Sequence, residues 1–260
     1  MSKLEVIKQA VNELLQQHCL DAAVHIETDE GILSVNSHQV FSSASLIKVP
    51  ILLTALSEVE KGRLHLAEEV KGGLSVGGAG VLSALSPNPS FTWQDILTLM
   101  MIVSDNSATN WIIDRLEMET INRLIKSLNL EQTCLNRKMM DFQAIERGVN
   151  NLTSAYDMVQ LLKVMKDKGR WIKDSYMLMD SIMTKQQFTL LTAELEEESH
   201  PNISYGSKSG SLQGVQHDCA YFYHKNKYVL AAVLTANLPN QMIGKQLISE
   251  IGMAIKRYII

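Results

Sequence analysis

Strand-like segments lie at both ends of the chain, while the long middle is helical in its pattern, and this arrangement limits the fold most strongly. Near the N-terminus, residues 22–27 and 32–36 predict two strands joined by a tight turn. Near the C-terminus the strand-like period returns from Ile203, and residues 221–223 and 229–235 flank another turn. Neither set alone can bury its apolar face, so we expect the two ends to meet in one sheet.

Helical periods surround and separate these strands. Apolar residues recur at three- and four-residue steps from Ser2 to about Gln17, and a last helix is predicted from about Gln241 to Tyr258. With 260 residues, 46% of them hydrophobic, the chain is long enough for one domain with two lobes. We therefore predict an α/β (α+β) fold, in which an antiparallel sheet is flanked by the terminal helices and carries an inserted all-helical lobe. The predicted division is one domain over 1–260, with a sheet lobe of 1–42 plus 200–260 and a helical lobe of 43–199.

Charge and hydropathy exclude several classes of partner. The net charge is -4 and no lysine- or arginine-rich run occurs, so we expect neither nucleic acid nor a membrane as partner. No uncharged apolar run of about 18 residues is present. The first nine residues interleave charges with apolar side chains, so we expect no signal peptide and a cytoplasmic protein with a small-molecule substrate.

Cysteine and histidine spacing predicts no metal and no cofactor. The three cysteines are far apart and form no CxxC pair, which favours reduced thiols over a disulfide framework or a zinc site. A group of possible ligands near the C-terminal strands lacks the HxxxH or HxH spacing of a metal site. The cysteines are Cys19, Cys134 and Cys219. The group of possible ligands consists of His200, His217, Asp218, Cys219 and His224.

Three short motifs occur in order and at wide spacing, and together they indicate one nucleophilic site. They are Ser45-Leu46-Ile47-Lys48, Ser104-Asp105-Asn106 and Lys208-Ser209-Gly210. An SxxK match alone is expected about once by chance in such a chain, and the other two motifs each well below once. Alone, the first motif is better explained by Ser45 as a helix cap and Lys48 extending to solvent. The conjunction of all three favours catalysis.

The spacing of the first motif suggests a nucleophile beside its base. Three residues apart on a helix, Ser45 and Lys48 share a face, so that the amine can reach the hydroxyl. A lysine acts as a base when its pKa falls toward neutrality, which burial and a second cation both produce. Lys208 is the candidate for that second cation.

The other two motifs supply polar groups around the predicted nucleophile. Ser104 and Asn106 follow an apolar stretch, where a hydroxyl can relay a proton and an amide can hold a carbonyl, while Asp105 is also a candidate cap for the helix from Ser107 to Leu116. Gly210 lies in a strand-like segment, where the missing side chain lets a ligand approach. The amides of Ser45 and Ser211 are candidates for an oxyanion hole.

At these residues the chain resembles the serine β-lactamase and penicillin-binding protein superfamily, and within it the class A β-lactamases. The runs that carry the resemblance are residues 43–50, SASLIKVP, and residues 103–110, VSDNSATN. The resemblance implies a β-lactamase/transpeptidase-like fold and a role for each motif residue. Ser45 would be the acylated nucleophile, Lys48 an acylation base, Ser104 a proton relay and Asn106 a contact to the substrate amide. Lys208 and Ser209, followed by Gly210 and Ser211, would bind the substrate, with Ser209 where many members have threonine.

One stretch departs from the class A pattern. Class A enzymes carry an arginine, two places later the glutamate that activates the deacylating water, and an asparagine four residues further on. After Arg137, this chain has Met139 and Gln143 at those places. Asp141 and Glu146 are the alternative carboxylates for the same water, and spacing assigns neither.

The sequence thus predicts a serine hydrolase acting through an acyl-enzyme at Ser45, with hydrolysis of a β-lactam amide as the leading hypothesis. The alternatives are an esterase or amidase of the same fold, and a protein that binds β-lactams or peptides and acylates without efficient turnover. The predicted partner is accordingly a β-lactam or a related amide or ester. A cell-wall transpeptidase or carboxypeptidase and a glutaminase are less favoured by the motifs and the lack of an export signal.

Overall fold

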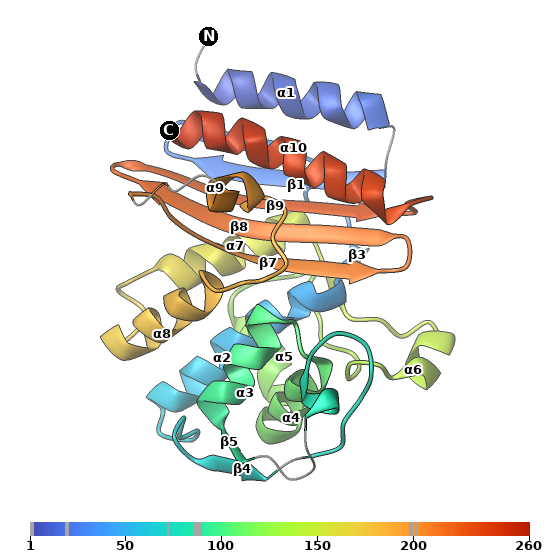
Figure 1. The fold of residues 1–260 in the computed structure, drawn as a ribbon, viewed down its shortest axis with the longest axis vertical. Coiled ribbons are helices and arrows are strands. Elements are labelled where there is room, and N and C mark those ends of the chain that lie inside the picture. Colours follow the sequence, from blue (N-terminus) through green and yellow to red (C-terminus); the bar gives the residue numbers. More distant parts are fainter. Residues whose placement is uncertain (1–2, 19–20, 72, 86–89, 198–199, 201) are drawn as a thin grey trace.

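The fold is an α+β arrangement in which one sheet separates two groups of helices (Figure 1). The computed structural model describes residues 3–18, 21–71, 73–85, 90–197, 200 and 202–260. Ser2 and Cys19, which entered the predictions above, lie outside the described residues. Both ends of the chain contribute strands to the central sheet, as expected, and the division into lobes at residues 42/43 and 199/200 stays a prediction.

The sheet has five antiparallel strands in the order β2-β1-β9-β8-β7. The first two are β1 (Asp21–Thr28) and β2 (Gly31–Val35), and the last three are β7 (Ser204–Leu212), β8 (Val215–His224) and β9 (Lys227–Ala236). N-terminal β1 pairs with C-terminal β9 along its whole length, from Asp21 opposite Ala236 to Thr28 opposite Val229. The predicted meeting of the two ends is therefore confirmed, and β7 is left at one edge of the sheet.

The terminal helices cover one face of this sheet. They are α1 (Lys3–His18) and α10 (Gln241–Ile259), which lie together above the strands in Figure 1. One buried apolar cluster joins the terminal helices to the side chains on this face of the sheet, and it includes Ile7 and Val11 of α1 and Ile248 and Ile251 of α10. The short α9 (Ala193–Glu197) joins this layer. Apolar residues recur every three to four positions along each helix, which gives each helix the single apolar face that it buries.

The opposite face carries the helices of the middle segment. They are α2 (Lys48–Glu60), α3 (Trp93–Ile102), α4 (Asn106–Leu116), α5 (Met118–Ser127), α6 (Phe142–Glu146), α7 (Ala155–Lys166) and α8 (Lys173–Met183), with 3-10 turns η1 (Ala44–Ile47) and η2 (Leu82–Ala84). Residues 48–56 of α2 are buried on every side, because α2 is apolar all round and runs through the centre of this group. Each fully buried leucine there contributes about 2 kcal/mol by burial.

Two short strand pairs interrupt this helical segment, which the periodicity did not predict. They are β3 (Phe41–Ser42) with β6 (Leu152–Thr153), and β4 (Glu69–Lys71) with β5 (Ser90–Thr92). Strands of two or three residues are too short to show an alternating pattern. The pair β3–β6 matters for the site, because β3 leads directly into η1 and Ser45. In the part of the chain that the structure describes, no helix combines the length and apolar character needed to cross a membrane.

Candidate active site

The structure brings the three sequence motifs together at one point between the helices and the edge strand β7. Lys48 is fully buried at the start of α2, and its Nζ lies 3.1 Å from Ser45 Oγ. The same Nζ lies 3.0 Å from Ser104 Oγ, 2.6 Å from Ser104 O and 3.0 Å from Asn106 Oδ1. One amine thus contacts two segments that are more than fifty residues apart in the sequence.

Asp105 holds the second motif in place through hydrogen bonds to neighbouring backbone N–H groups. Its carboxylate accepts the N–H of Ala108 at 2.9 Å and so caps α4. The second oxygen accepts the backbone N–H groups of Val81 and Leu82 at 2.6 and 2.8 Å. The candidate cap at Asp105 is confirmed, and the helix that it caps begins at Asn106. The left-handed backbone of Ser104, with φ of 56°, turns that residue toward Lys48.

Lys208 adds a second buried cation on the other side of Ser104. Its Nζ donates to Ser104 Oγ at 3.2 Å and to Ser209 O at 2.7 Å, and its side chain is fully buried on β7. Ser104 Oγ is therefore shared by two lysines. A hydroxyl between two amines can pass a proton from one position to the other.

Burial lowers the pKa values of both lysines. For Lys48, burial lowers the pKa well below its usual range and the charge of Lys208 lowers it further, against the opposing effect of the Asp105 carboxylate. For Lys208, burial lowers the pKa to about 8, while Asp218 and Cys219 act in the opposite direction. The lowered pKa of Lys48 favours the neutral amine that a general base requires.

Gly210 allows β7 to approach the nucleophile closely. A Cβ atom at Gly210 would lie 3.1 Å from both Ala44 Cβ and Ser45 N, and 3.3 Å from Leu46 N. The missing side chain therefore lets the edge strand pack against η1 beside the backbone of Ser45. This contact puts Ser211 near Ser45, and the oxyanion hole formed by their two amides stays a prediction.

Two cavities border Ser45. The sheet-side cavity has a volume of about 470 Å³ and is lined by Ser104, Ser209 and Ser211, by residues 187–190, and by two residues that the motifs did not indicate, Gln216 and Lys245. The loop-side cavity has a volume of about 270 Å³, and its lining includes Asn106, Arg137, Met139, Met140, Phe142 and Ile145. Ser45 lines both cavities. A ligand whose reacting bond lies at Ser45 Oγ would therefore extend one portion into each cavity.

Lys245 and Gln216 could not be found from the sequence by motif or period. Lys245 is an exposed position on α10, where a lysine has the usual look of a solvent-facing side chain. Gln216 lies on β8 opposite Ser211 and is buried. Lys208 lines neither cavity itself and acts on the sheet-side cavity through Ser104, Ser209 and its charge.

The two candidate carboxylates for water activation lie outside the lining of both cavities. Asp141 caps α6 by accepting the N–H of Ala144 at 2.9 Å, and Glu146 is exposed at the end of that helix. Met139 instead lines the loop-side cavity, where Asn110 binds its backbone N–H and C=O at 2.8 and 3.1 Å. A deacylation role for Asp141 or Glu146 stays a prediction, and these contacts do not favour it.

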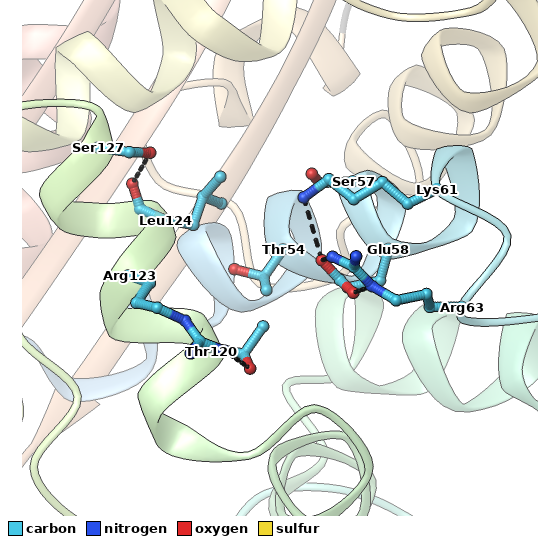
Figure 2. A pocket seen from close by; sticks show the side chains of 9 residues that line it. All are labelled: Thr54, Ser57, Glu58, Lys61, Arg63, Thr120, Arg123, Leu124 and Ser127. Atoms are coloured by element: carbon cyan, nitrogen blue, oxygen red, sulfur yellow. Dashed lines mark hydrogen bonds and ion pairs between the residues drawn. The ribbon is translucent and has the colours of Figure 1, made fainter.

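A third cavity, of about 440 Å³, lies between α2 and α5 and is shown in Figure 2. Its charged groups pair largely with one another, since Glu58 accepts from both Lys61 and Arg63. No nucleophile beside a base occurs among the residues drawn there, so this cavity is not the candidate active site. Among the described residues, no group of three His, Cys, Asp or Glu side chains is placed to hold a metal ion.

Known proteins are similar to this chain over nearly its whole length. The sequence model of the beta-lactamase enzyme family, Beta-lactamase2, matches residues 6–259. The crystal structure of a beta-lactamase from Sphaerobacter thermophilus DSM 20745 superposes with a TM-score of 0.88 at 25% identity, over 98% of this chain and 96% of that chain. A mutant of PBP-A, as an acyl-enzyme complex with penicillin G, superposes with a TM-score of 0.82 at 27% identity, over 98% and 97% of the two chains.

One curated relative is longer than this chain. The D-alanyl-D-alanine carboxypeptidase DacF of Bacillus subtilis (strain 168) is 23% identical over 255 residues, which are 93% of this chain. The match spans 63% of the length of DacF. The likeness therefore concerns the part that carries the three motifs and leaves more than a third of the relative unmatched.

Proposed function

Because this chain belongs to the beta-lactamase enzyme family, we propose that it hydrolyses the amide bond of β-lactams through an acyl-enzyme at Ser45. The family and the fold are those of serine hydrolases, which confirms the resemblance inferred from the three motifs. Small molecules are the substrates that such a family implies. The cytoplasmic location inferred from the sequence stays a prediction.

The observation that carries the proposal is the contact of the buried Lys48 Nζ with Ser45 Oγ, at 3.1 Å. A serine hydroxyl is a weak nucleophile unless a base removes its proton. An amine with a lowered pKa, placed at hydrogen-bond distance, supplies that base near neutral pH. Roughly 10²- to 10⁴-fold in rate is typical of such proton transfer.

The proposed acylation consists of attack by Ser45 and then cleavage of the lactam C–N bond. Ser45 Oγ attacks the lactam carbonyl while its proton moves to the neutral amine of Lys48, and the carbonyl oxygen becomes an oxyanion. The C–N bond then breaks, and the leaving nitrogen receives a proton from Lys48 through the hydroxyl of Ser104, which lies 3.0 Å from that amine. The product is an ester at Ser45, and Lys48 is neutral again.

The two cavities support a substrate with unlike ends. On the sheet side, the Ser209 hydroxyl, the exposed Lys245 and the field of buried Lys208 suit a carboxylate on the leaving portion. On the loop side, Phe142 and Ile145 are apolar side chains exposed by 60% and 38%, beside Met139 and Met140. An apolar acyl group would cover them. Penicillins with an aromatic side chain have both features.

A second candidate function is a protein that acylates and then stalls. It is favoured by one specific observation, which is that no Asp or Glu occurs among the described residues that line either cavity at Ser45. Without a carboxylate to activate it, water attacks the ester slowly. In that case the protein would act as a long-lived covalent binder of β-lactams or related peptides.

Incubation with a fluorescent penicillin and with nitrocefin, followed by intact mass and absorbance over time, tests both functions. Mass gain at Ser45 with continuing nitrocefin turnover supports a β-lactamase, and mass gain that persists supports the stalled binder. Ser45→Ala should form no adduct, while Ser57→Ala in the cavity of Figure 2 should behave as the parent protein. The proposal fails if Ser45→Ala hydrolyses nitrocefin as fast as the parent, and a panel of esters then tests the esterase alternative.

A further inference from the structure

One wall of the sheet-side cavity is an irregular segment that two side chains help to hold, together with the hydrogen bond from Gln187 N to Ile102 O at 3.0 Å. Residues 187–190 line the cavity between the end of α8 at Met183 and the start of α9 at Ala193, and they form no helix or strand. Backbone N–H groups in such a segment need partners from elsewhere. Whatever accepts these N–H groups therefore sets the position of the wall.

Gln186 accepts from one end of this wall and Asp218 from the other. Gln186 Oε1 accepts the N–H groups of Gln187 and Phe188 at 2.9 and 3.0 Å, and its Nε2 donates to Met101 O at 2.8 Å. Asp218 Oδ2 accepts the N–H groups of Leu190 and Leu191 at 3.1 and 2.9 Å. Gln186 fixes its end to α3, and Asp218 fixes the other end to the sheet.

Asp218 lies between the wall and the residues proposed to bind the substrate. It is fully buried on β8, directly opposite Ser209 of the third motif. Next to its two N–H donors, Leu191 O lies so close to α10 that a Cβ at Gly252 would be 2.5 Å away. The wall is thus held between β8 and α10, the elements that supply Gln216 and Lys245 to the cavity.

We propose that Asp218 is a positioning residue that holds the wall of the sheet-side cavity at the width required for a substrate carboxylate between Ser209 and Lys245. The inference rests on the proposed function for the identity of that substrate. It concerns a residue that touches neither Ser45 nor the reacting bond. Loss of the Asp218 charge would loosen residues 190–191 and weaken binding of anionic substrates, without changing the chemical step at Ser45.

The surroundings of Asp218 give this role a pH dependence. Burial raises the pKa of its carboxyl to about 7, while the N–H groups of Leu191 and Leu190 and the charge of Lys208 act in the opposite direction. Of its neighbours on β8, His217 is neutral because burial lowers its pKa to about 4, and burial raises the pKa of the Cys219 thiol far above neutrality. Val233, opposite on β9, does not titrate. Asp218 therefore gains a proton, and becomes a weaker acceptor, as the pH falls through about 7.

Asp218→Ala and Asp218→Asn test the proposal, with Glu58→Gln as the control for loss of a buried carboxylate far from the site. Hydrogen exchange at Leu190 and Leu191 should become at least tenfold faster in Asp218→Ala, and less so in Asp218→Asn, whose amide oxygen still accepts N–H groups. The KM of penicillin G should rise about tenfold in Asp218→Ala, with kcat, or the limiting acylation rate, changed less than twofold. A neutral acetate ester, which has no carboxylate, should react equally well with all four proteins.

The pH profile separates positioning from a general loss of structure. In the parent protein, the KM of penicillin G should rise as the pH falls from 7.5 to 6, and Asp218→Asn should lose this slope because its side chain does not titrate. Equal damage toward penicillin G and the neutral ester would overturn the proposal, as would the same slope in Asp218→Asn. Equilibrium binding of penicillin G in a Ser45→Ala background gives the same comparison without any acylation, so that failure of the proposed function is distinguished from failure of this inference.

Discussion

Lys48 and Lys208 share one hydroxyl, that of Ser104, with their Nζ atoms 3.0 and 3.2 Å from its Oγ. Burial lowers the pKa of Lys48 well below its usual range, and the charge of the nearby Lys208 lowers it further. Lys208 keeps a pKa of about 8. The surroundings of the two lysines thus differ: the charge of Lys208 lowers the pKa of Lys48, whereas Asp218 and Cys219 oppose the effect of burial on Lys208.

Lys208→Gln should change the pH profile of acylation in a defined direction. Without the charge of Lys208 the pKa of Lys48 rises, so the acid limb of the acylation rate should move to higher pH. In the parent, binding of anionic substrates should weaken as the pH rises through about 8, where Lys208 loses its proton. Stopped-flow acylation by a fluorescent penicillin from pH 5 to 9 measures both limbs. Lys245→Gln is the control, since it removes an exposed cation outside the buried pair and should leave the acid limb in place.

Gly210→Ala should slow acylation by up to about a hundredfold, since outright loss of one oxyanion donor costs roughly a hundred- to a thousandfold. The added Cβ meets Ser45 N and Ala44 Cβ at 3.1 Å, so η1 must move away from β7. The rate of adduct formation measures this effect, and thermal unfolding checks the fold. Gly169→Ala, where a Cβ meets only the Asp167 side chain at 3.3 Å, should acylate at the parent rate. Unchanged acylation in Gly210→Ala would mean that close packing of β7 on Ser45 is not required.

Met139→Glu should shorten the lifetime of the acyl-enzyme by about a hundredfold, the lower end of the range for general-base catalysis. The substitution places a carboxylate in the loop-side cavity, at the position where the class A pattern has its glutamate. Met139→Gln has the same length without the charge and should keep the long lifetime. Chasing a labelled adduct by intact mass measures the difference. Equal lifetimes in both variants would show that water has no access to the ester from this cavity.

Glu58→Gln should destabilise the fold at neutral pH by about 1–2 kcal/mol, allowing for the exposed partners. The hydrogen bond from Arg63, aided by Lys61, lowers the pKa of Glu58 from 4.5 to about 2 (Figure 2). Because the folded-state pKa is depressed, the stabilisation is complete above about pH 4.5 and is lost as the pH falls through about 2. Denaturant unfolding of parent and variant at pH 7 and pH 3 should give a smaller difference at the lower pH. Asp114→Asn, in an exposed pair with Lys138, should show little difference at either pH.

Periodicity predicted the sheet and its covering helices because those elements are long and bury one side. The strand pairs β3–β6 and β4–β5 could not be predicted, since two or three residues carry no period. The motif residues were predicted by type and order, and their convergence follows from the packing of η1 against β7 and of α2 against α4.

Other parts of the site depend on contacts that no local pattern encodes. Lys245 resembles any solvent-facing lysine until α10 is placed beside β8, and Asp218 was considered only as a possible metal ligand. The sequence identified Met139 at the place of a missing glutamate, but not the Asn110 contacts that fix its backbone. Long-range packing decides each of these positions.

The contacts of Lys48 join residues 45, 104 and 106, and Ser104 extends the same cluster to residue 208. A chain that has formed only its helices, or only its sheet, lacks one side of this cluster and has no activated hydroxyl. Under the proposed function, a penicillin adduct at Ser45 therefore forms only on completely folded molecules. Pulse labelling with penicillin during refolding would report when these segments come together.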